Sequence, residues 1–258
     1  MPDNLSARDA QLAAIASTET SLENSPLRAS KFLTLVPASS DDLDVRVLRA
    51  RVQLQDQQYA AAARTLERAT QGFDNQYDGK YWLAVAERGQ GQVTQAGATL
   101  DQLLASQPDH QLGLEAKVRL VSDQKDWQAA LAAQARLSAL RPGSADAQCR
   151  LGDLFLRSKN LDKAEEPLQM GLRLEPYAFL CHRDLGELYR ATGRPVEAIR
   201  ELEWVVQYFP EGDAKTYISL FLAYEAVHKR AAAEFTLEKG KRLFPADPFL
   251  QKFSLKNN

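Results

Sequence analysis

Few side chains in this sequence have types and spacings that could do chemistry. The three histidines, His110, His182 and His228, stand at no spacing from Cys, Asp or Glu that is typical of a metal site. The carboxylate pair Glu165–Glu166 falls in a predicted helix, where adjacent side chains diverge, so it indicates a solvated face rather than an acid–base pair. Sequence motifs for a nucleophile elbow, a P-loop or a dinucleotide-binding loop are absent. We therefore expect no catalytic residue, no metal and no cofactor, and a protein that is not an enzyme.

The two cysteines, Cys149 and Cys181, are the remaining candidates for chemistry. We favour two reduced thiols that act as small packing residues, because an isolated pair of cysteines in a cytosolic protein usually does so. The alternative is a disulfide that braces two neighbouring segments, and sequence alone does not supply the geometry which that bond demands.

A fixed period organises the elements that would position these side chains. Prolines recur at intervals of 34, 34, 34 and 35 residues, at Pro108, Pro142, Pro176, Pro210 and Pro245. A period near 34 is typical of units that contain two helices, and neighbouring units of this kind stack to bury a continuous core.

The unit that ends at Pro210 shows the pattern most clearly. Small residues take the slots where two helices would cross and large residues fill the opposite groove, at Leu185, Gly186, Tyr189, Ala198 and Leu202. Gly193 suits the end of the first helix, and Pro195 suits the start of the second. Pro167 falls inside the second helix of the preceding unit, where we expect a kink or a late helix start.

This pattern resembles the tetratricopeptide repeat family, whose unit reads W-x2-L-G-x2-Y, then A-x3-F, then P. The corresponding positions of three successive units are Gln148, Leu151, Gly152, Phe155, Ala164, Leu168 and Pro176; His182, Leu185, Gly186, Tyr189, Ala198, Leu202 and Pro210; and Tyr217, Leu220, Phe221, Tyr224, Ala233, Leu237 and Pro245. The resemblance implies an all-α fold, a right-handed superhelical solenoid of antiparallel helix pairs with about six to seven repeats. Because His182 takes the Trp slot of the motif, we expect it to pack rather than to bind a ligand.

We predict a single solenoid over residues 1–258. Its repeats span residues 43–76, 77–110, 111–144, 145–178, 179–212 and 214–247, after a degenerate N-terminal repeat or cap at 1–39 and before a short C-terminal tail or cap at 248–258. For the tail we favour a short helix that lays Phe249, Leu250 and Phe253 on the last repeat. The alternatives are an exposed apolar end that pairs with a second copy of the chain, or a piece cut from a longer protein.

Composition limits the classes of partner. With a net charge of -2, the chain is not expected to bind nucleic acid or a membrane surface. It holds no run of 18 apolar residues, so no membrane span is expected. The first residues lack the basic start and apolar core of a signal peptide, which favours a cytoplasmic location, or a periplasmic or secreted one if a leader has been removed.

The resemblance also implies which side chains face a concave groove, because the first helices of the family line it. Carried over residue by residue, the groove positions that we expect to bind a partner are Arg51, Tyr81, Val85, Arg88, Glu115, Arg119, Asp153, Arg157, Arg183, Glu187, Arg190, Ile218 and Leu222. The arginines would suit an acidic peptide or a chain terminus. Alternatively, each arginine pairs with a neighbouring acid such as Glu115, Asp153 or Glu187. The carboxylate clamp of some family members is not expected, since no Asn stands at the required slot.

The resemblance therefore implies a non-catalytic adaptor that binds a protein or an extended peptide in its groove. Tyr81, Val85, Ile218 and Leu222 would supply apolar contacts, and the arginines would orient the partner. Two alternatives belong to other classes: a structural subunit that self-associates into a homo-oligomer, for which the apolar C-terminal end would serve, and a regulatory domain excised from a larger protein.

Overall fold

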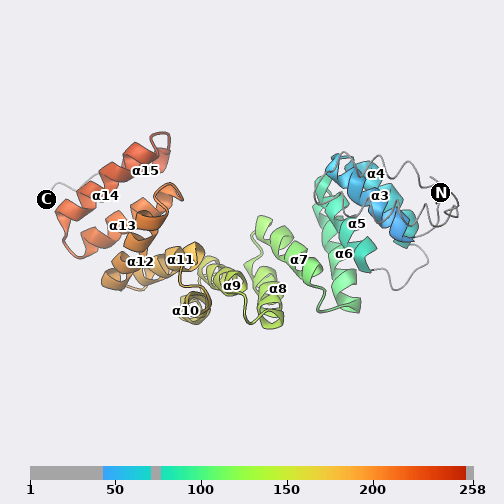
Figure 1. Cartoon of the computed structure of the whole chain (residues 1–258), viewed down its shortest axis with the longest axis horizontal. Helices are drawn as coiled ribbons and strands as arrows, with labels where there is room; N and C mark the ends of the chain where they lie inside the picture. The colour runs from blue at the N-terminus through green and yellow to red at the C-terminus, as the bar shows by residue number, and fades with distance from the viewer. Residues whose placement is uncertain (1–42, 71–76, 254–258) are drawn as a thin grey trace, which may run out of the picture. The chain divides into compact units, whose positions relative to one another are not determined.

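The computed structural model describes residues 43–70 and 77–253, and every regular element in these ranges is helical (Figure 1). The chain divides into two compact units, Met1–Lys125 and Asp126–Asn258, here called unit 1 and unit 2. The N-terminal repeat or cap predicted for residues 1–39 lies outside the described residues, as does the end of the tail. None of the helices in the described ranges has the length and apolar character that crossing a bilayer requires.

The described part of unit 1 contains two complete helix pairs and one further helix. Its helices are α3 (Leu43–Gln55), α4 (Tyr59–Thr70), α5 (Tyr77–Gly89), α6 (Val93–Ser106) and α7 (Gln111–Asp123). One buried cluster includes Ala50 and Leu66, and a second includes Leu100 and Leu120. The core of unit 1 therefore lies between successive helices, as expected for stacked pairs.

Unit 2 continues the same arrangement of helix pairs. Its elements are α8 (Trp127–Leu140), α9 (Ala145–Arg157), a 3₁₀ turn (Leu161–Lys163), α10 (Glu165–Leu174), α11 (Phe179–Ala191), α12 (Pro195–Tyr208), α13 (Ala214–Ala226), α14 (Arg230–Leu243) and α15 (Pro248–Lys252). One large buried cluster runs from Cys149 to Leu250. The predicted fold class, an all-α array of helix pairs, is confirmed, whereas the handedness of the superhelix stays a prediction.

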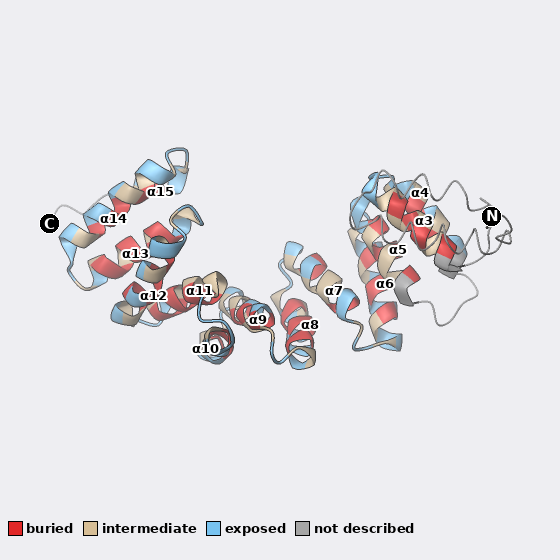
Figure 2. Cartoon of the chain, viewed as in Figure 1, coloured by how far each residue is buried: buried red, intermediate tan, exposed pale blue. Residues whose placement is uncertain are grey.

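Small residues allow the two helices of each pair to approach closely, as the motif predicts. The alanine slot of the second helices is fully buried, at 0% exposure, in Ala62, Ala96, Ala130, Ala164, Ala198 and Ala233. A Cβ added at Gly152 would overlap the side chain of Leu168, and one at Gly186 would overlap Leu202. Figure 2 shows buried residues concentrated where the helices of a pair meet. Each glycine therefore makes room for a buried leucine of the facing helix.

Proline sets where two of the second helices begin. Pro195 is the first residue of α12, where the missing N–H costs nothing. Pro167 is the third residue of α10, which begins at Glu165 after a 3₁₀ turn and has only 10 residues, against 14 in α12. The late helix start predicted for this position is confirmed, since proline is tolerated in the first turn and excluded further along.

The C-terminal segment forms the short helix that we favoured. Leu250 of α15 is fully buried, and the ring of Phe253 meets the ring of Phe221 of α13 edge-on at 5.8 Å. Lys241 Nζ also donates a hydrogen bond to the Phe253 carbonyl oxygen at 2.9 Å. Phe249 was expected to pack as well, and this was wrong: its side chain is 67% exposed. Asp247 caps the helix by accepting hydrogen bonds from the amides of Phe249 and Leu250.

Candidate functional site

A pocket of about 370 Å³ lies in unit 1, lined mainly by the first helices α5 and α7 and also by the second helices α4 and α6; we call it the unit 1 pocket. Five of the predicted binding residues line it: Tyr81, Val85 and Arg88 from α5, and Glu115 and Arg119 from α7. Its remaining walls are Tyr59, Ala84, Gly89, Ala96, Leu100, Ala116 and Leu120. The pocket thus combines apolar walls with the charged side chains of Arg88, Glu115 and Arg119.

The packing of Tyr59 against Gly89 shapes one side of the unit 1 pocket. A Cβ added at position 89 would overlap the Tyr59 ring, so only glycine admits the aromatic side chain from α4 at this place. Sequence analysis missed Tyr59, because it belongs to a second helix and such helices were not expected to reach the groove.

Charges of both signs act on the phenol of Tyr81 in the unit 1 pocket. Burial raises the pKa of Tyr81 above its usual value, while the charges of Arg119 and Arg51 oppose that rise and the charge of Glu115 adds to it. The Tyr81 hydroxyl therefore stays protonated near neutral pH and is able to donate a hydrogen bond.

The three arginines near Tyr81 differ in how far they are already engaged. Arg88 pairs with Asp123 at 2.7 Å, and the Arg51 guanidinium lies over the Trp82 ring, 5.1 Å from its centroid. Arg119 is exposed and, in the described part of the chain, has no ion-pair partner. Arg119 is thus the arginine of this pocket whose donors remain for a ligand.

A second pocket, of about 460 Å³, lies in unit 2, and we call it the unit 2 pocket. Four of the predicted binding residues line it: Asp153 and Arg157 from α9, and Arg183 and Glu187 from α11. Its remaining walls are Leu156, Leu161, Asp184, Ala191, Asp213 and Lys215. Asp184 and Asp213 were not predicted, since neither falls at a groove position of the motif.

Ion pairs already engage the arginines of the unit 2 pocket. Arg157 Nε donates to Asp153 Oδ2 at 2.7 Å, and Arg183 Nε donates to Asp184 Oδ1 at 2.8 Å. Burial raises the pKa of the Asp184 carboxyl to about 6, although Arg183 opposes the shift. The alternative in which arginines pair with neighbouring acids therefore holds for Arg157 and Arg183.

Four predicted binding residues line neither pocket. Arg51 lies over Trp82, and Arg190 donates to Glu187 Oε2 at 3.0 Å. Ile218 and Leu222 are partly buried and pack against the core of unit 2. For these four residues a role in binding stays a prediction.

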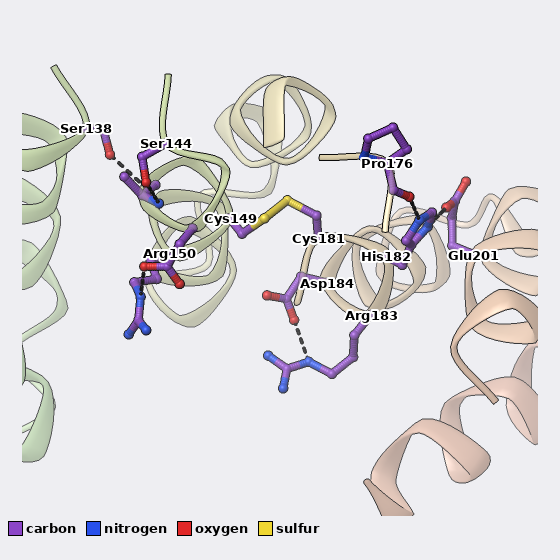
Figure 3. Close-up of a disulfide and its surroundings, with 12 residues drawn as sticks. Ser138, Ser144, Cys149, Arg150, Pro176, Cys181, His182, Arg183, Asp184 and Glu201 are labelled. Carbon is purple, nitrogen blue, oxygen red and sulfur yellow. Dashed lines mark hydrogen bonds and ion pairs between the residues drawn. A yellow bond between two sulfur atoms is a disulfide. The ribbon is translucent and has the colours of Figure 1, made fainter. Parts of the chain in front are cut away.

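The two cysteines form a disulfide, which corrects the favoured prediction of reduced thiols. Cys149 of α9 and Cys181 of α11 are fully buried, and their Cα atoms are 5.0 Å apart, within the range that a disulfide spans (Figure 3). A Cβ at Gly171 of α10 would overlap both sulfur atoms. The glycine is thus the sequence signal that could have indicated the bond, but only once α10 is known to lie against both cysteines.

His182 is a packing residue, as its place in the Trp slot predicts. Its ring stacks on Trp204 with centroids 3.7 Å apart. Its Nδ1 lies 2.7 Å from Glu201 Oε2, and its Nε2 lies 2.9 Å from the Pro176 carbonyl oxygen (Figure 3). In the residues that the structure describes, no group of three or more His, Cys, Asp or Glu side chains could hold a metal ion.

Comparison with known proteins adds the family and the fold. Two models described as tetratricopeptide repeat match the sequence, over residues 53–118 and 116–179. No curated protein matches it.

Solved structures with a similar fold have low sequence identity to this chain. The PilF protein of Pseudomonas aeruginosa is 20% identical with a TM-score of 0.64, over 82% of this chain and 96% of its own. MamA of Desulfovibrio magneticus RS-1 is 21% identical with a TM-score of 0.59, over 68% and 99%. YrrB, described as a tetratricopeptide repeat protein with an unusual peptide-binding site, is 18% identical with a TM-score of 0.59, over 73% and 96%. At such identities the likeness shows the fold alone.

Proposed function

Because the chain belongs to the tetratricopeptide repeat family, whose members are generally non-catalytic interaction scaffolds, we propose that it is an adaptor. It binds a protein or an extended peptide along the first helices of its repeats, and it has no catalytic activity of its own. YrrB, which has the same fold, is described as having a peptide-binding site, which supports a function of this class.

One observation carries the proposal: the predicted binding residues gather in pockets. Nine of the thirteen line either the unit 1 pocket or the unit 2 pocket, although they were chosen from sequence positions alone. Both pockets are lined mainly by first helices and mix apolar walls with charged groups. Side chains of a partner could therefore bury apolar area there and fix their orientation by hydrogen bonds.

The unit 1 pocket favours an apolar side chain that stands next to a carboxylate in the partner. Val85, Leu100 and the other apolar walls would cover the apolar group. Arg119, which has no ion-pair partner among the described residues, and the protonated Tyr81 hydroxyl would donate to the carboxylate. We infer that this part of the partner is acidic.

The disulfide indicates in which kind of cellular compartment the protein functions. Disulfides persist in oxidising compartments and are rare in a reducing cytosol. The bond between Cys149 and Cys181 therefore supports a periplasmic or secreted location over a cytoplasmic one.

Charge reversal at Arg119 tests the proposal. We expect Arg119→Glu to lower the amount of partner captured from the native lysate by about tenfold, because it repels a carboxylate that the wild type attracts. Mass spectrometry of the captured proteins, with helical content from circular dichroism, provides the measurement. Arg64→Glu is the matched control, since Arg64 is an exposed arginine of α4 that does not line the pocket. Equal capture by wild type and Arg119→Glu would remove the unit 1 pocket from the binding site.

Exposed aromatic side chains near the end of unit 2 favour self-association as a second candidate function. Phe235 of α14 is 65% exposed and Phe249 of α15 is 67% exposed. Exposed apolar groups of this size often mark contacts between chains. A monomeric mass that does not change with protein concentration would remove this candidate.

A further inference from the structure

Asp184 is a buried acid whose hydrogen bonding is incomplete. Its residue is 3% exposed and it lines the unit 2 pocket. Arg183 occupies Oδ1, while Oδ2 is buried and has no hydrogen-bond partner among the described residues. Figure 3 shows Asp184 on α11 beside the disulfide that joins this helix to α9. A buried carboxylate oxygen without a donor is costly, so such an oxygen at a pocket wall points to a donor that arrives from outside.

Charged groups face Asp184 from three elements. Asp153 and Arg157 stand on α9, Arg183 and Glu187 stand on α11, and Asp213 and Lys215 stand at the start of α13. With Asp184, the pocket wall holds four acids and three bases, so its net charge is -1 when all are ionised.

Two of the three bases of this wall form short ion pairs with acids of the wall, and the third, Lys215, lies near an acid of the wall. Arg157 is paired with Asp153, and Arg183 with Asp184. The Lys215 ammonium is 70% exposed and lies 3.8 Å from Glu187. An incoming anion would compete with these carboxylates for donors, whereas an incoming cation would meet an acceptor that is not yet used.

We propose that the unit 2 pocket binds a cationic side chain of the partner, a lysine or an arginine, with Asp184 as its acceptor. This inference rests on the proposed function, because it assigns to the same adaptor a second, basic feature of its partner. Leu156, Leu161 and Ala191 also line the pocket and would cover the aliphatic stem of the bound side chain. The volume of about 460 Å³ is ample for one such side chain.

Binding of a cation to Asp184 should weaken in acid. Burial raises the pKa of Asp184 to about 6, so the carboxyl takes up a proton as the pH falls below that value and then loses the charge that attracts the cation. Affinity is expected to fall by about tenfold for each pH unit below the pKa, since only the ionised form binds.

Short peptides with neutral ends test the inference on the full chain. We expect Ac-Ala-Ala-Arg-Ala-Ala-NH2 to shift the NMR signals of α9 and α11 in the wild type at pH 7.5, and to bind about tenfold more weakly to Asp184→Asn. Asp146→Asn is the matched control, because Asp146 is an ion-paired acid of α9 that does not line the pocket. The same peptide with Glu in place of Arg should not bind.

Several results would overturn the inference: equal binding of the arginine peptide to wild type and Asp184→Asn, equal binding of the glutamate peptide, or no binding of the arginine peptide. The wild type supplies a second measurement that does not depend on how well a variant folds, since an affinity unchanged between pH 7.5 and pH 5 also contradicts the proposal. Capture of a partner by the wild type separates the two proposals. If the partner is captured while the arginine peptide does not bind, this inference fails and the adaptor function stands.

Discussion

At the scale of single residues, ion pairing decides which arginines are available for binding. The arginines of the predicted groove look alike in the sequence, yet Arg157 and Arg183 are neutralised by Asp153 and Asp184, whereas Arg119 has no ion-pair partner among the described residues. The partner of Arg183 could not be predicted from helical spacing. Glu187 stands four residues further on, but it accepts hydrogen bonds from Arg190 and Ser219 instead.

Sequence analysis missed the role that we propose for Asp184, for a related reason. Its importance depends on burial and on an oxygen that lacks a donor, and both follow from how α9 and α11 pack. Residue type and repeat position do not carry that information, whereas the predicted groove positions, such as Val85 and Arg183, follow from the motif itself.

Reduction of the disulfide should destabilise unit 2. The bond closes a separation of 32 residues, for which the loss of chain entropy in the unfolded state corresponds to about 3 to 4 kcal/mol of stability. We expect dithiothreitol to lower the free energy of unfolding in urea by about this amount in the wild type. In Cys149→Ala/Cys181→Ala the reductant should have no effect. Detection of two free thiols per chain after unfolding without a reductant would contradict the presence of the disulfide.

At the scale of elements, the turns between the helices of a pair repeat more regularly than their sequences do. Residues with positive φ recur at Gln57, Gly91, Lys125, Lys159, Gly193 and His228, at intervals of 34 residues and finally 35. Only two of the six are glycine, so residue type predicted the turn at Gly193 and missed the same backbone conformation at Lys159. Packing of the helix pair therefore determines the positive φ of the turn, even where the residue at that position is not glycine.

Replacement of Lys159 by glycine should stabilise the protein. Lys159 is exposed with φ 62°, a conformation that costs a side-chain-bearing residue about 1 kcal/mol more than it costs glycine. We expect Lys159→Gly to raise the free energy of unfolding by up to about 1 kcal/mol in urea denaturation. Gly193→Lys, which makes the reverse change at the equivalent turn, should lower it by a similar amount. A loss of stability in Lys159→Gly would show that the lysine side chain makes a stabilising contact.

At the scale of the whole molecule, the proline period predicts the helix pairs well. The first helices begin at Leu43, Tyr77, Gln111, Ala145, Phe179 and Ala214, which are the first residues of the predicted repeats. The N-terminal repeat and the single solenoid over the whole chain stay predictions.

The division into two units could not be predicted from the proline period. It falls between α7 and α8, inside the repeat that was predicted for residues 111–144. Two departures from the motif accompany it. Lys117 of α7, in the slot of the motif's leucine, donates to Asp101 of α6 at 2.8 Å. Gln134 of α8, in the slot of the second helix's large apolar residue, donates to the Ala147 carbonyl of α9 at 3.0 Å. Each helix of this repeat thus bonds to a neighbour in its own unit.

Photo-crosslinking from the unit 1 pocket tests the central claim, that the first helices bind a protein partner, most directly. A benzophenone amino acid would replace Val85, which lines the pocket, and in a second variant would replace Arg64, which is exposed on α4 and does not line it. On irradiation in the native lysate, we expect a covalent adduct with a discrete protein from position 85 and none from position 64. An adduct from position 64 alone would place the interface on the second helices and contradict the account.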